Sequence, residues 1–190
     1  MRTAPVVETR RSLATPQLLG VVGDTHTSPH RPSAALASVV DLFTRARVDL
    51  ILHTGDAGDY SVLKDLERVA PVVAVRGNAD PRELVDALPD RVWFDIGTWT
   101  VLLLHGHHGK TAKVTAKSMA GPGVDLVVYG HSHQPGIVQE GETILFNPGS
   151  PTEKRWNPHF GVGLIGVSDS GIDPELVLFD DHRHLVNVTF

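Results

Sequence analysis

The stretch LLGVVGDTH, residues 18–26, joins an apolar run to an aspartate and a histidine. A short apolar run bounded by glycine is typical of a buried β-strand, so we predict a strand over residues 18–23. Asp24 and His26 then lie in the loop after the strand, where a carboxylate oxygen and an imidazole nitrogen can reach the same cation. The same two residues also suit a helix cap beside a surface histidine. The rest of the chain must decide between these interpretations.

Short apolar runs alternate with segments of helical periodicity up to Tyr129, which is typical of an α/β layered fold. In this part we predict strands at 18–23, 50–54, 71–76 and 126–129, a hairpin of 92–96 with 100–104, and helices at 32–47, 59–69, 82–88 and 110–119. Later strands are predicted at 137–138, 143–146, 161–167 and 175–179, separated by Gly, Asn and Pro turns without helices. This pattern favours two sheets packed face to face.

The length of 190 residues is that of one domain, which we place at residues 18–190. Residues 1–17 have no sustained periodicity, so we expect a flexible N-terminal tail there. A targeting or partner-binding role for this tail is the alternative. Because the tail lacks the apolar core of a secretory signal and no apolar run reaches roughly 18 residues, we expect a cytoplasmic protein that does not enter membranes.

Composition limits the classes of partner and of ligand. The net charge of −5 argues against a broad basic surface, so we expect no stable nucleic-acid binding, whereas a small phosphorylated substrate stays compatible. There is no cysteine, which excludes disulfides and thiolate ligands and leaves nitrogen and oxygen as metal ligands.

Seven polar residues follow the ends of predicted strands. They are Asp24, His26, Asp56, Asn78, His105, His131 and His133. Because the carboxyl ends of strands in an α/β sheet meet at one edge, these side chains are expected to converge in one crevice. Each can also be ordinary turn or surface chemistry, but together they favour a metal site. Mixed nitrogen and oxygen ligands suit Mn, Fe, Zn, Ni or Co better than Mg or Ca, and a carboxylate such as Asp56 can bridge two cations.

Five short motifs contain these residues. They are GDTH at 23–26, GDAGD at 55–59, GNAD at 77–80, HGH at 105–107 and GHSH at 130–133. As a set they resemble the motifs of calcineurin-like metallophosphoesterases. The short chain and the sequence NPGS at 147–150 are similar to the small bacterial and archaeal YfcE-type phosphodiesterase branch of that family.

The resemblance implies a four-layer α-β-β-α sandwich of two mixed β-sheets, the metallo-dependent phosphatase fold. It also implies two divalent transition metal ions, with Mn²⁺ expected first and Fe, Zn, Ni or Co as alternatives. One ion would be held by Asp24, His26, Asp56 and His133, and the other by Asp56, Asn78, His105 and His131. A hydroxide bridging the two ions would attack phosphorus in line, so the expected function is hydrolysis of small phosphodiesters, with Asp56 and Asn78 in catalytic roles.

One position departs from the family pattern. Many members have a histidine after the asparagine of the third motif, where this chain has Ala79, which can neither donate a proton nor bind phosphate. His107 or His108 is a candidate substitute, and the role of Asp80 is open. The alternatives are a phosphomonoesterase or nucleotide phosphatase on the same site, or a protein-interaction scaffold like the retromer subunit of this fold. A homo-oligomer is possible, with Trp93, Phe94 and Trp99 either between subunits or in the core.

Overall fold

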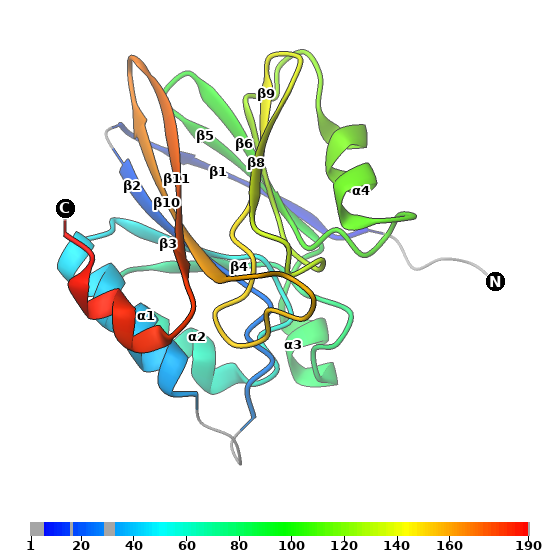
Figure 1. Ribbon diagram of the computed structural model, residues 1–190. Helices are drawn as coiled ribbons and strands as arrows, with labels where there is room; N and C mark the ends of the chain where they lie inside the picture. Colours follow the sequence, from blue (N-terminus) through cyan, green and yellow to red (C-terminus); the bar gives the residue numbers. More distant parts are fainter. Residues whose placement is uncertain (1–5, 16, 29–32, 190) are drawn as a thin grey trace.

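The computed structural model describes residues 6–15, 17–28 and 33–189 (Figure 1). The strands are β1 Glu8–Leu13, β2 Gln17–Val22, β3 Leu50–His53, β4 Val72–Ala74, β5 Arg91–Ile96, β6 Trp99–Leu104, β7 Leu126–Tyr129, β8 Gly136–Glu140, β9 Thr143–Asn147, β10 Phe160–Ser168 and β11 Gly171–Phe179. The helices are α1 Ala34–Ala46, α2 Tyr60–Glu67, α3 Arg82–Ala87, α4 Ala112–Met119 and the 3₁₀ helix η1 His182–Asn187. Every strand predicted from residue 18 onward is present, with ends shifted by a few residues.

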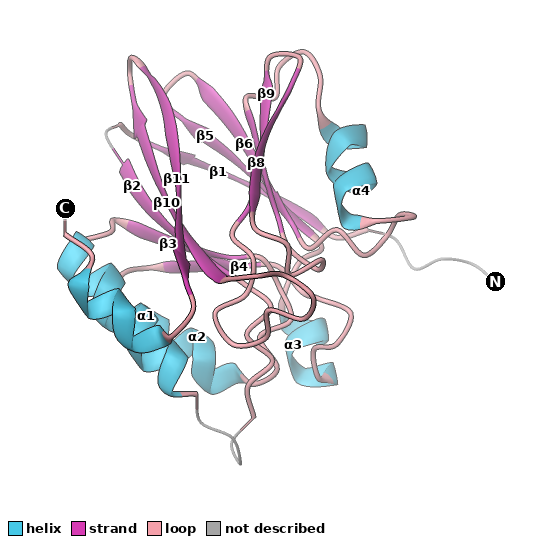
Figure 2. Ribbon diagram, in the orientation of Figure 1, coloured by secondary structure: helices cyan, strands magenta, loops and turns pink. Residues whose placement is uncertain are grey.

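Two mixed sheets lie face to face between helices (Figure 2). One has the strand order β11-β10-β2-β3-β4 and the other β1-β5-β6-β7-β9-β8. Apolar side chains such as Leu19, Phe94 and Phe146 fill the space between the sheets. A second core lies under α1, α2 and α3, and a third under α4 on the opposite outer face. The predicted four-layer α-β-β-α sandwich is therefore confirmed.

Parallel strands in each sheet send their following loops toward one edge. In the first sheet β2, β3 and β4 are parallel neighbours, and in the second β6, β7 and β9 are parallel neighbours. Each of these strands is buried along most of its length because both of its faces are covered, which explains its continuous apolar sequence. The loops that follow them carry the seven polar residues described above.

Residues Glu8–Leu13 correct the expectation of a flexible tail over 1–17, because they form β1, which pairs in parallel with β5. Arg10 forms an ion pair with Asp95. A second pair joins Glu8 to Arg91 at 2.9 Å. The strand gave no periodic signal because it lies at the edge of the sheet with nearly all its side chains exposed. Residues 1–5 and Pro16 of the expected tail lie outside the described residues.

The last two strands, β10 and β11, belong to a different sheet from the preceding hairpin of β8 and β9. β10 pairs with β2, so β10 and β11 return to the first sheet instead of extending the second. η1 then packs against α1 through the buried Leu185, and Arg45 donates to the Leu185 carbonyl at 2.6 Å. None of the helices formed by the described residues has both the length and the apolar composition of a membrane span.

Candidate metal centre

Left-handed backbone at the strand ends turns the predicted ligands inward. Asp24, His26, Asp56, His131 and His133 have φ values of 51°, 44°, 54°, 69° and 56°. Non-glycine residues adopt this conformation at a cost of order 1–3 kcal/mol, and such residues cluster at functional sites. Two of the loops are held to each other, since the Asp24 amide donates to the Gly55 carbonyl at 2.9 Å and the His26 amide to the Asp56 carbonyl at 3.0 Å.

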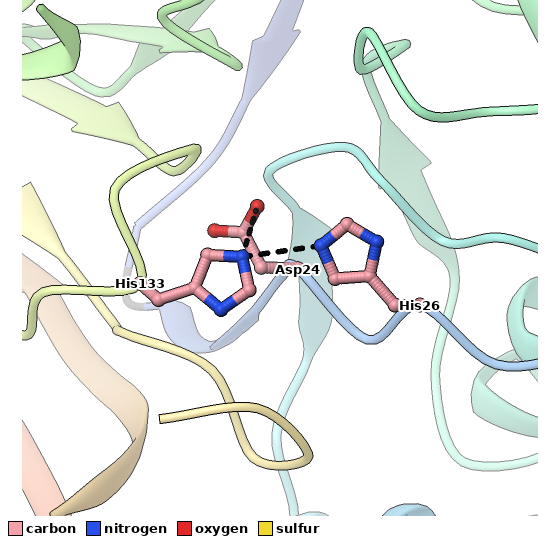
Figure 3. A group of neighbouring side chains, drawn as sticks. All are labelled: Asp24, His26 and His133. Carbon is pink, nitrogen blue, oxygen red and sulfur yellow. Dashed lines mark hydrogen bonds and ion pairs between the residues drawn. The ribbon is translucent and has the colours of Figure 1, made fainter. Parts of the chain in front are cut away.

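The first group of ligand atoms belongs to Asp24, His26 and His133 (Figure 3). The Nδ1 of His133 lies at the carbonyl of Glu153 and must be its protonated nitrogen, which leaves a lone pair on Nε2. That Nε2 lies 3.1 Å from the Nε2 of His26 and 3.7 Å from Oδ1 of Asp24. Asp24 Oδ1 is buried and has no hydrogen-bond partner among the described residues. Two imidazole nitrogens and a carboxylate oxygen thus face one another, which suits a cation between them.

The second group is built in the same way around His105. Its Nδ1 donates to the Thr54 carbonyl at 2.7 Å, so Nε2 is the nitrogen left to face the centre, where it can offer a lone pair to a cation. This Nε2 lies 3.2 Å from Oδ2 of Asp56 and 3.3 Å from Oδ1 of Asn78. The ligand atoms of Asp56, His105 and His131 all lie within 4.8 Å of one another. The structure therefore brings nitrogen and oxygen donors together here as well.

Asp56 connects the two groups through a single atom. Its Oδ2 is 3.2 Å from His105 Nε2 in the second group and 3.7 Å from His26 Nε2 in the first. Its other oxygen accepts a hydrogen bond of 2.7 Å from the Ala79 amide, which fixes the carboxylate. The seven predicted ligands thus lie in one place, as two groups that share Asp56. Their donor types and the unpartnered Asp24 oxygen fit divalent transition metals.

Burial and neighbouring charges shift the pKa values of several predicted ligands. Burial raises the pKa of Asp24 to about 7. Burial also acts to raise the pKa of Asp56, but the hydrogen bond and charge of His105 outweigh it and lower that pKa to about 2. Burial lowers the pKa of His133 to about 4, so its imidazole is neutral near pH 7, the form that ligates metals. A cation would offset the buried charge of Asp24.

His53 supports the site, and the sequence analysis missed it. Its Nδ1 accepts a hydrogen bond of 3.2 Å from the Gly55 amide, and its Nε2 lies 3.2 Å from the hydroxyl of Thr25. It therefore joins the loop after β2 to the loop after β3. Its only sequence signal is a histidine at the end of an otherwise apolar strand. Burial lowers its pKa to about 4, which keeps the ring neutral.

Asp80, whose role was open, ties two of the loops together. Its carboxylate accepts from the amides of Gly77 at 2.7 Å, Gly58 at 3.0 Å and Asp56 at 3.2 Å. It holds the backbone that presents Asp56 and Asn78. Close packing continues at Gly77, where a Cβ would lie only 1.9 Å from Oδ1 of Asp56. Glycine is needed there because the backbone passes directly against the carboxylate.

His107 and His108 lie next to the centre, in a third group with Asp90. Both carboxylate oxygens of Asp90 already have hydrogen-bond donors. They accept from Arg76 at 2.9 and 2.7 Å, from His108 at 3.0 Å and from the Val7 amide at 2.8 Å. We interpret Asp90 as an anchor for His108. The ring of His107 lies 5.3 Å from that of His105, and burial lowers its pKa to about 4. A neutral ring carries no spare proton for a leaving group, so an acid role for His107 stays a prediction.

The chain is similar in sequence and in fold to known proteins. Residues 18–170 match the family model described as the calcineurin-like phosphoesterase superfamily domain. A probable metallophosphoesterase of Methanothermobacter thermautotrophicus is 35% identical over 163 residues, covering 84% of this chain and 91% of that protein. The phosphodiesterase YfcE of Escherichia coli is 31% identical over 175 residues, covering 80% and 89%. A crystal structure of a Vps29 variant from Entamoeba histolytica has a TM-score of 0.65 at 24% identity, covering 86% and 99%, which shows likeness of fold.

Proposed function

Because the chain belongs to the calcineurin-like phosphoesterase superfamily, we propose that it is a metal-dependent phosphodiesterase that hydrolyses small phosphodiesters. The observation that carries the proposal is the shared Oδ2 of Asp56, which faces ligand nitrogens of both groups. A relative named as a phosphodiesterase, the YfcE protein, supports the choice of diester. A phosphomonoesterase or nucleotide phosphatase remains the alternative on the same residues.

Asp24, His26 and His133 would hold one divalent cation, and Asn78, His105 and His131 the other, with Asp56 shared. When bound, two such cations would activate a water molecule and offset charge on the phosphoryl oxygens. Imidazole and carboxylate donors favour manganese, iron, zinc, nickel or cobalt, of which we propose Mn²⁺ first. The chain's own contribution is to fix the donors, through Thr54, Glu153 and the backbone amides described above.

Ala79 limits what the chain offers to the leaving group. Its amide holds Asp56, and its methyl group supplies no proton. We therefore propose that the enzyme favours esters whose leaving groups depart without a proton, such as nitrophenolate. This preference separates it from relatives of the family that have histidine at that position.

The test is hydrolysis of bis(4-nitrophenyl) phosphate by the protein loaded with Mn²⁺. We expect turnover in the wild type, its loss in Asp56→Ala, and its retention in Asp65→Ala, a half-buried aspartate on α2 paired with Arg68. Absence of activity with every divalent transition metal would contradict the proposal. Full activity in Asp56→Ala would contradict it equally.

A protein-interaction scaffold is the second candidate, and the fold alone does not exclude it. The likeness to Vps29 at 24% identity shows the architecture and no activity. Retention of donor side chains at all seven positions favours the enzyme, since a scaffold does not need them. A homo-oligomer and a cytoplasmic location stay predictions. Phe94 is fully buried in the core between the sheets, so it is not available to a subunit interface.

A further inference from the structure

Backbone conformation sets Arg155 apart from other surface residues. Among the described residues, positive φ at a non-glycine residue occurs at five predicted ligands, at Arg47 and at Arg155. Arg47 is the C-cap of α1, where left-handed backbone is ordinary. Arg155, with φ of 51°, ends no helix. Strained backbone away from caps is a mark of functional positions, so Arg155 belongs with the ligands in this respect.

The loop that carries Arg155 is fastened to the metal centre on both sides. Before it, the hydroxyl of Ser150 donates to the Asp24 carbonyl at 2.7 Å, and the Glu153 carbonyl accepts from His133. After it, the side-chain amide of Asn157 donates to the His133 carbonyl at 2.8 Å. The position of Arg155 is therefore set by the same residues that present Asp24 and His133.

The side chain of Arg155 is not used to hold the fold together. Arg155 is exposed and has no hydrogen bond or ion pair with another described residue. A guanidinium with all its donors free, on a loop bonded to the backbone of Asp24 and His133, is suited to phosphoryl oxygens.

Trp156 follows directly, and its side chain is 100% exposed. It lies one residue from Asn157, whose side-chain amide is bonded to the backbone of His133, so the backbone at Trp156 is held beside the loop that carries His133. Tryptophan is highly buried on average, so a wholly exposed indole is free to contact a ligand. An indole face is a platform on which planar bases stack.

We propose that Arg155 and Trp156 form a substrate-binding subsite that selects phosphodiesters carrying a planar aromatic base, as in a nucleoside ester. The guanidinium binds a phosphoryl oxygen, and the indole stacks on the base. The inference rests on the proposed phosphodiesterase function and adds a substrate class to it. Arg155 and Trp156 are specificity-determining residues here, because neither supplies a proton or a nucleophile.

The test compares two esters with the same leaving group, thymidine 5′-(4-nitrophenyl) phosphate and methyl 4-nitrophenyl phosphate. We expect Trp156→Ala to lower the ratio of kcat/KM for the thymidine ester over the methyl ester by about 5-fold or more, and Trp156→Phe to keep most of it. Arg155→Gln should lower kcat/KM for both esters about 10-fold, with Arg155→Lys less affected. Tyr60→Ala in α2 and Arg68→Gln at its C-cap, both at exposed residues, are the matched controls.

A binding measurement separates this subsite from the chemistry. Thymidine 5′-monophosphate should quench the fluorescence of the Mn²⁺-loaded wild type, and Trp156→Phe should lose most of that quench while calorimetry still detects binding. If no ester is hydrolysed but binding follows this pattern, the phosphodiesterase proposal fails and the subsite stands. An unchanged ester ratio in Trp156→Ala, or binding that is equal in wild type and Arg155→Gln, overturns the subsite.

Discussion

His53 gives the most quantitative prediction of the structure. The side chain is fully buried, and its pKa falls from 6.5 to about 4 because burial disfavours the charged ring. A folded-state pKa below the unfolded value means that the stability is present above pH 6.5 and is lost as pH falls toward 4. A difference of about 2.5 pKa units corresponds to about 3 kcal/mol at full protonation, and to about 2 kcal/mol at pH 5.

The variant His53→Asn removes the titrating group. We expect it to be less stable than the wild type at pH 7, because it loses contacts to Gly55 and Thr25. Its free energy of unfolding should then fall by about 2 kcal/mol less than that of the wild type between pH 7 and pH 5. The assay is urea unfolding of metal-free protein at both pH values, with His159→Asn, at a half-buried histidine, as control. Equal losses in wild type and His53→Asn would refute the assignment.

Two further predictions concern the ligand loops. In Gly77→Ala the new Cβ would meet Oδ1 of Asp56 at 1.9 Å, so we expect a loss of about 1–3 kcal/mol in urea unfolding and at least a halving of bound metal by elemental analysis. Gly136→Ala, with open space around its Cβ, should change neither quantity. Because burial raises the pKa of Asp24 to about 7, stability of the metal-free protein should be lost as pH rises through 7, by about 1 kcal/mol between pH 6 and 8. Asp24→Asn or added Mn²⁺ should abolish that loss in thermal unfolding, and a loss that persists in both would count against it.

The central layers of the fold were predictable because burial imposes a simple pattern. β2, β3, β6 and β7 are covered on both faces, so each reads as a continuous apolar run ending at a polar loop residue. The convergence of the seven polar residues followed from that placement, since parallel strands end at one edge. The motif pattern then pointed to the family.

What the sequence could not reveal depends on contacts between distant segments. β1 is an exposed edge strand held by pairing with β5 and by ion pairs, so it has no apolar alternation to detect. β10 pairs with β2, a strand far from it in the sequence. Local periodicity predicts the two strands but does not indicate that they pair. The anchoring of His108 by Asp90 and the left-handed backbone of Arg155 likewise arise from the folded loops.

The central claim is that two cations share Asp56. Elemental analysis of the purified protein, reconstituted with Mn²⁺ near pH 7.5 and freed of excess metal, tests it most directly. About two metal ions per wild-type chain, falling to one or fewer in Asp56→Ala and unchanged in Asp65→Ala, is the expected result. Less than about one ion per wild-type chain, or an undiminished content in Asp56→Ala, would contradict the claim.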